Sequence, residues 1–190
     1  MKRSFIRPLV LSTVLAAGVL GNAAAATYTT LDSANSKVTF DYSQMSVNMN
    51  GAFSEVKATR LNFDPASPDT ATVSLEIALK GVDAGYAEAN TELATESWLN
   101  TAAHPLATFT SKKITAKGDN RFEAVGDLSI KGKAHEVTVP FSVTQTNDTG
   151  VFEGKFTFRR SDFGIGEGQW ADFSIVANDI TVNFSLVAKP

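Results

Sequence analysis

The chain contains no cysteine and only two histidines among its 190 residues. The lack of cysteine excludes disulfides, thiol catalysis and cysteine-ligated metals. The histidines, His104 and His135, lie far apart in the sequence and show neither an H-x-x-H nor an H-E-x-x-H spacing. Since catalytic zinc typically takes three protein ligands, we expect no metal site and interpret both histidines as surface or turn residues.

A serine-hydrolase motif of the form G-x-S-x-G is also absent. One acid pair, Glu88 and Glu92, has the i,i+4 spacing of a helix and could act as an acid and a base. Paired catalytic carboxylates need burial to separate their pKa values, so a solvated helix face is the favoured interpretation. These absences favour a protein that is not an enzyme.

Only one long apolar run occurs, from Leu9 to Leu20, with basic residues before it and four alanines after it. The run is too short to span a bilayer core of roughly 30 Å, and this order of features is typical of a secretory signal. We therefore predict a signal peptide at residues 1–26, cleaved before Ala26 or Thr27, and one domain at residues 27–190. An uncleaved N-terminal anchor is the alternative.

Positive charge is scarce after the predicted leader. Three of the 17 basic residues lie in the leader, so 14 remain against 20 acidic residues, and the net charge is near −6. A balance of this sign disfavours nucleic acid and anionic membrane surfaces as partners. Because no second long apolar run follows, we also expect no stable membrane insertion.

What the chain does have is phenylalanine at alternate positions of short runs, as at Phe156 and Phe158. A period of two indicates strands with one apolar face. Eight candidate strands, separated by turn residues, cover 36–42, 52–64, 72–80, 106–116, 122–130, 136–143, 151–159 and 174–188. This spacing predicts an all-β antiparallel sheet, closed as a barrel or packed as a sandwich. An eight-stranded barrel is either filled by its own side chains or wide enough for one small ligand.

Three local signals interrupt the strand pattern. Asn50-Gly51 predicts a type I′ turn, because both central residues of that turn need positive φ. Residues 86–103 contain good helix formers and predict a short helical insertion, with Thr95 as the N-cap of a second turn. The alternating glycines at 164–168 predict a loop whose backbone can approach a neighbour or a ligand, or a simple bulge.

Eight aromatic residues are our candidate ligand-binding residues. Six are predicted to line the barrel and two tryptophans to lie near its mouth or lid: Phe40, Phe53, Phe109, Phe141, Phe156, Phe158, Trp98 and Trp170. Buried aromatics usually only pack against one another, so each of them could equally be ordinary core. The alternation predicts the face on which they lie but cannot distinguish lining from filling.

Three segments resemble motifs of the YceI-like family. The first, from Gly81 to Ser111, contains G-V-D-A-G, N-T-E-L, S-W-L-N and H-P-L-A-T-F-T-S. The second, Gly126 to Gly132, resembles a G-x-L-T-x-x-G step, and the third, Arg160 to Ile165, resembles an R-S-D-F-G motif. Together with the leader, the resemblance covers essentially the whole chain.

The resemblance implies a lipocalin-like antiparallel barrel around a long isoprenoid chain, a periplasmic location and the capacity to form a homodimer. Some relatives occur beside or fused to cytochrome b-type membrane proteins, which indicates isoprenoid quinones. The chain departs from the family at polar positions: a frequent histidine after the first strand is replaced by the stretch from Tyr42, and an acid and an arginine are replaced by Asn90 and Ala94. A diphosphate head needs arginine or lysine partners, and the remaining Arg160 could pair with Asp162 instead.

We therefore expect a periplasmic binding or carrier protein for a long apolar molecule, a polyisoprenoid or isoprenoid quinone, that uses no cofactor. Each buried methylene contributes ~0.8 kcal/mol, so a long chain binds without a strong ionic contact. A ligand-free structural or stress-response barrel is the alternative, and an enzyme acting on a lipid head group is the third hypothesis.

Overall fold

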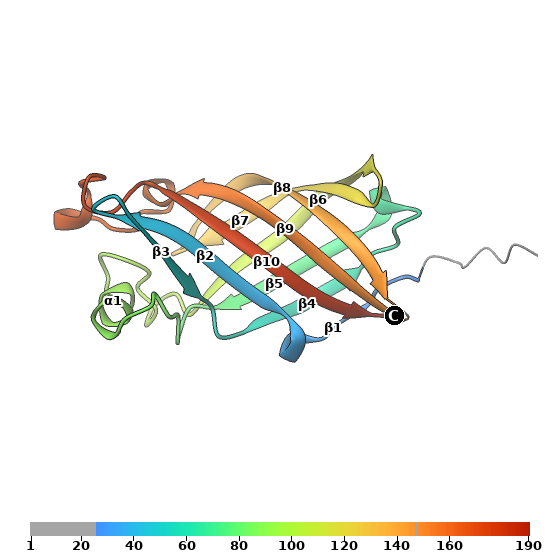
Figure 1. The fold of residues 1–190 in the computed structure, drawn as a ribbon, viewed down its shortest axis with the longest axis horizontal. Coiled ribbons are helices and arrows are strands. Elements are labelled where there is room, and N and C mark those ends of the chain that lie inside the picture. Colours follow the sequence, from blue (N-terminus) through green and yellow to red (C-terminus); the bar gives the residue numbers. More distant parts are fainter. Residues whose placement is uncertain (1–25, 147) are drawn as a thin grey trace, which may run out of the picture.

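The computed structural model describes residues 26–146 and 148–190, and these form one curled antiparallel sheet with a short helix at one end (Figure 1). The strands are β1 (Thr30–Leu31), β2 (Lys37–Gln44), β3 (Val47–Ala52), β4 (Val56–Asn62), β5 (Thr72–Ala78), β6 (Leu106–Gly118), β7 (Arg121–Ile130), β8 (Lys133–Thr146), β9 (Thr149–Arg159) and β10 (Asp179–Lys189). The helix is α1 (Ala87–Leu93), and short 3-10 segments are η1 (Ser33–Asn35), η2 (Pro68–Thr70), η3 (Arg160–Phe163) and η4 (Gly168–Trp170). The predicted leader, apart from Ala26, lies outside the described residues.

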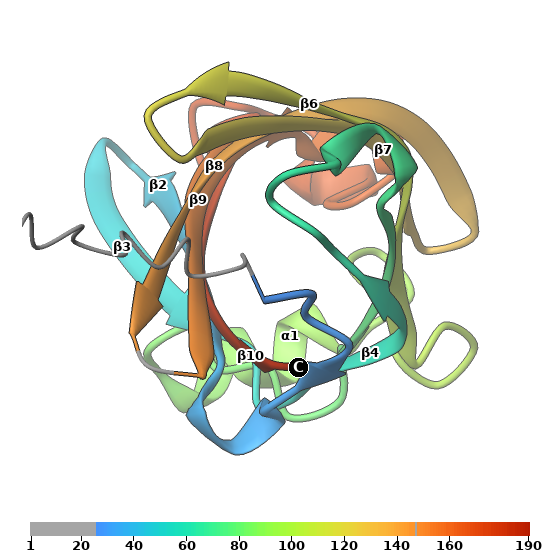
Figure 2. The ribbon, with the colours of Figure 1, turned by 90° about the vertical axis from the view of Figure 1, so that its right-hand side faces the viewer.

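The sheet order is β3-β2-β10-β9-β8-β7-β6-β5-β4, and β1 pairs with β10. The sheet curls until its two sides meet, where Tyr28 and Phe63 exchange two backbone hydrogen bonds of 2.8 and 3.0 Å. Figure 2, which looks along the long axis, shows the strands arranged in a ring. The predicted antiparallel barrel is therefore confirmed, with ten strands in place of the eight expected.

The first hairpin differs from the prediction. Asn50 and Gly51 lie within β3, and the turn falls at Met45 and Ser46, which have φ of 49° and 64°. Gly51 pairs with Phe40 of β2, and a Cβ at Gly51 would collide with the Phe40 ring. The glycine is therefore needed for close packing, not for a turn. The strand predicted at 52–64 is shorter, because β3 takes residue 52, residues 53–55 connect β3 to β4, and β4 ends at Asn62.

The helical insertion predicted at residues 86–103 contains α1, followed by turns. Thr95 is not an N-cap, because its hydroxyl donates to the Glu92 carbonyl (2.8 Å) at the end of α1. It therefore helps to close one helix rather than open another. Figure 1 places α1 at the end of the barrel opposite the C-terminus.

The other end of the barrel is filled by an aromatic plug, which we define as Tyr28, Phe63, Phe122, Phe141 and Phe152. Phe63 lies 5.2 Å from both Phe122 and Phe152, edge to face, and both Tyr28 and Phe63 are fully buried. Edge-to-face pairs of this kind add stability beyond the apolar area they bury. The aromatic plug therefore packs the interior at this end of the barrel.

Candidate ligand cavity

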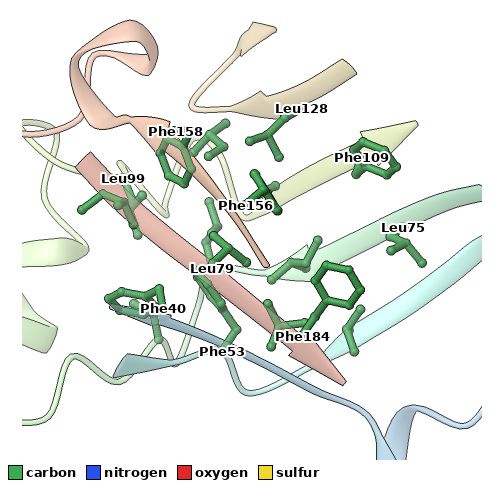
Figure 3. Close-up of a pocket in the computed structure, with 18 of the residues that line it drawn as sticks. Phe40, Phe53, Leu75, Leu79, Leu99, Phe109, Leu128, Phe156, Phe158 and Phe184 are labelled. Atoms are coloured by element: carbon green, nitrogen blue, oxygen red, sulfur yellow. The ribbon is translucent and has the colours of Figure 1, made fainter. Parts of the chain in front are cut away.

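A cavity of about 420 Å³ extends through the barrel from the aromatic plug to the α1 end. This volume is in the range of sites that hold small molecules. Alternate residues of the strands point into it, as β5 shows with Val73, Leu75 and Ile77, and Figure 3 shows aromatic and aliphatic side chains from several strands converging there. Of the 42 lining residues, only Glu88, Glu92 and Arg160 carry a formal charge. The cavity is thus suited to an apolar molecule.

All eight predicted aromatic residues lie on the wall of this cavity: Phe40, Phe53, Trp98, Phe109, Phe141, Phe156, Phe158 and Trp170. Phe141 lies at the plug, where its ring stacks on Phe122 at 5.4 Å. Trp98 and Trp170 lie together at the other end, with ring centroids 5.6 Å apart. The sequence therefore predicted the inner face correctly, and the part these residues take in ligand binding stays a prediction.

Polar groups concentrate where the cavity reaches the α1 end. The Tyr86 hydroxyl donates to Gln44 Oε1 (2.8 Å), and the Tyr42 hydroxyl donates to the Ala84 carbonyl (2.9 Å). Burial, helped by the neighbouring Tyr86, raises the pKa of Tyr42, so the phenol stays neutral. Polar groups of the wall therefore gather at the α1 end.

A second polar contact joins two parts of this end. Trp170 Nε1 donates to Glu92 Oε1 (2.7 Å), which ties η4 to α1. The neighbouring Trp98 is 7% exposed, and its Nε1 is buried without a hydrogen-bond partner among the described residues. Buried donors are normally paired. The wall therefore holds a donor that the described residues leave unpaired.

Arg160 is the one cation on the cavity wall, and it is 1% exposed. Its five N–H groups donate to five backbone carbonyls at 2.7–3.1 Å, those of Ile165, Gly166, Trp170, Val176 and Ala177. The guanidinium also lies 5.4 Å from the Trp98 ring centre and 5.1 Å from that of Phe173. Burial lowers the pKa of Arg160. Every donor of this side chain is thus used to hold the loop after β9 in shape.

Arg160 does not pair with Asp162, the alternative that the sequence left open, because the carbonyls take all five donors. The predicted close approach of the glycine loop is explained by the same side chain. Gly166 has φ of 75°, and a Cβ there would collide with the Arg160 guanidinium. The loop therefore packs its backbone on a neighbouring side chain, and its second anchor is Lys131, whose Nζ donates to the Gly164 carbonyl (2.6 Å).

The remaining polar candidates have local partners. Asn90 accepts a hydrogen bond from the Ala84 N–H (2.6 Å) and donates to Asp83 (3.1 Å), which joins α1 to the preceding turn, and Ala94 is exposed. His135 Nε2 lies 3.0 Å from the Asp162 carbonyl. Across the described part of the chain, no three histidine, aspartate or glutamate side chains lie close enough together to hold a metal ion.

Phe184, Gln44 and Tyr86 also lie on the cavity wall and were not among the predicted binding residues. Phe184 could have been found, because it alternates with the apolar residues of β10. Gln44 and Tyr86 lie 42 positions apart and meet only because α1 folds over the end of β2. No pattern within either segment predicts that contact.

No helix among residues 26–146 and 148–190 is long and apolar enough to cross a membrane. The structure resembles that of Burkholderia cenocepacia BcnA, with a TM-score of 0.80 and 38% identity over 84% of this chain and 99% of that one. It also resembles a polyisoprenoid-binding domain from Saccharophagus degradans implicated in plant cell wall breakdown (TM-score 0.68, 14% identity, 86% of this chain and 99% of that one), which shows the fold alone.

In sequence, the chain is 30% identical over 110 residues to a UPF0312 protein of Azotobacter vinelandii, a match over 55% of this chain and 57% of that protein. The chain therefore aligns with little more than half the length of this relative. A family profile described as "YceI-like domain" matches residues 29–188, which is nearly all of the described structure. The chain belongs to the YceI-like family.

Proposed function

We propose that this chain is a periplasmic binding or carrier protein for a long apolar lipid, a polyisoprenoid or an isoprenoid quinone. It would be exported by a signal peptide at residues 1–26 and act as the domain at 27–190. The observation that supports this is the cavity of about 420 Å³, whose wall is apolar except at one end. An empty apolar space of this size costs stability, and an apolar chain that fills it would recover that stability.

The charges at the polar end favour a neutral head group. Arg160 has no free donor for an anion, and the two other charged wall residues, Glu88 and Glu92, are acidic. A diphosphate would therefore lack a cationic partner and meet negative charge. A quinone or alcohol oxygen instead accepts a hydrogen bond, and Trp98 Nε1 is an unused donor on this wall.

Lipid extraction from protein purified from its own host tests this proposal. Mass spectrometry should find a neutral lipid with a long apolar chain, near one molecule per protein. Leu75 points into the cavity and Glu76 is its outward neighbour on β5. Leu75→Trp should fill the cavity and reduce the bound lipid at least tenfold, whereas Glu76→Trp should leave it unchanged.

The outcomes separate the hypotheses. Empty extracts from the natural host, together with a Leu75→Trp variant that is more stable and otherwise unaltered, would support a ligand-free structural barrel. A phosphorylated lipid as the main ligand would show that the assignment of a neutral head group is wrong, while the carrier function would stand.

A further inference from the structure

Large apolar side chains are exposed at the α1 end of the barrel. Three of them form what we call the apolar tip: Met45, Val47 and Phe173, which are 68%, 59% and 48% exposed. They come from two segments that the backbone joins, because the Met45 N–H donates to the Ile175 carbonyl (2.8 Å). The β2–β3 hairpin and the loop before β10 thus bring these three exposed side chains to the same end of the barrel. Exposed apolar clusters of this kind mark sites of interaction.

Met45 is also an unusual residue for its position in the turn. The hairpin connection has two residues, Met45 and Ser46, both with positive φ, and Gln44 pairs with Val47 on either side. Turns of this type favour asparagine and glycine, because a bulky side chain is strained at positive φ. A methionine that is both strained and exposed contributes nothing to folding that asparagine would not provide better. A role for its side chain outside the fold explains its presence.

The tip is continuous with the cavity. Gln44, the neighbour of Met45, lines the cavity, and so does Trp170, three residues before Phe173. The two segments that carry the tip contain no lysine or arginine, at residues 38–56 and 161–188. Lys131 and Arg160 contact the second segment, but they donate to its backbone carbonyls. Attraction to anionic lipid or nucleic acid therefore cannot explain this surface. An apolar edge without basic residues, at the polar end of a lipid-sized cavity, matches the boundary of a neutral bilayer.

We propose that the apolar tip inserts transiently into the surface of a membrane and aligns the cavity with it, so that a lipid passes between bilayer and barrel without crossing water. The inference rests on the proposed function, because the cargo must reside in a membrane. Only three side chains enter the bilayer, so the contact is reversible and differs from stable insertion.

Flotation with neutral phosphatidylcholine vesicles tests the inference. Met45→Asn, Val47→Ser and Phe173→Ser should each lower the vesicle partition coefficient by about tenfold, the effect of losing one buried apolar side chain. The matched control is Leu106→Ser, since Leu106 is 42% exposed on β6, across the barrel from β2, and should change partition less than twofold. Met45→Asn should keep or raise the melting temperature, because asparagine suits positive φ, so its loss of binding cannot be ascribed to unfolding.

Lipid bound at equilibrium, measured by extraction, should be the same in all four variants, whereas transfer from vesicles should slow in the three tip variants. A wild-type protein that extracts with lipid but does not float with vesicles would refute membrane docking and leave the carrier function intact. Absence of lipid would refute the carrier function instead. If the wild type is a dimer that does not bind vesicles, and the tip substitutions convert it to a monomer, the tip is an interface between copies. Vesicle partition that depends on anionic lipid would refute the apolar mechanism.

Discussion

Replacing Arg160 by methionine should destabilise the barrel by about 4 kcal/mol or more. The side chain is 1% exposed and satisfies five carbonyls, and methionine of similar length donates to none of them. Each buried carbonyl left without a partner costs ~1–3 kcal/mol, and relaxation of the loop after β9 would recover part of the sum. Since small domains are stable by only ~5–15 kcal/mol, the variant should be marginally folded.

Urea unfolding followed by tryptophan fluorescence measures this loss. The stability of Arg160→Lys should lie between that of the wild type and that of Arg160→Met. Its three ammonium donors leave at least two carbonyls unpaired, a cost of about 2–6 kcal/mol before the loop relaxes. The matched control is Arg159→Met, since Arg159 is the exposed neighbour on β9 and its loss should change stability by less than about 0.5 kcal/mol. A loss below about 1 kcal/mol for Arg160→Met would contradict a structural role. Arg160→Lys with unchanged stability but weaker binding of an anionic lipid would show that Arg160 is a head-group receptor.

Two further predictions concern the plug and the α1 end. The Tyr28 hydroxyl is buried without a partner among the described residues, so Tyr28→Phe should keep or raise stability by up to about 1 kcal/mol in urea unfolding; a loss of more than that would mean that the hydroxyl is bonded. Hydrogen bonds from the Gly85 N–H and the Asn90 amide lower the pKa of Asp83 below its usual 3.8. The stability that these hydrogen bonds contribute to α1 is therefore complete above pH 3.8. It is lost as the pH falls through the lower pKa that Asp83 has in the folded protein. The NMR chemical shift of the Gly85 amide should change with pH, with its midpoint at the pKa of Asp83, and this pH dependence should vanish in Asp83→Asn. A midpoint at or above pH 3.8 would contradict the hydrogen bonds.

Local patterns predicted the wall of the cavity because a strand places alternate residues on opposite faces wherever it lies. Phe156 and Phe158 point inward for that reason, and their prediction needed no knowledge of the neighbouring strands. The hairpin at Met45 and Ser46 could not be predicted in this way. Its location depends on the pairing of Gly51 with Phe40, a contact across two strands, and the local turn signal at Asn50-Gly51 favoured the wrong position.

The polar residues show the same difference between local patterns and contacts between distant segments. The sequence by itself determined the strand pattern, the inner aromatic face, the shortage of catalytic groups and the resemblance to the YceI-like family, because each follows from residue type and spacing. Only the tertiary structure decided that all five N–H groups of Arg160 donate to backbone carbonyls. It also decided that Gln44 and Tyr86 form a hydrogen bond and that Met45 lies beside the loop carrying Phe173. Those outcomes depend on which segments the closing barrel brings together, and a hydrogen bond between distant segments leaves no periodic signal along the chain.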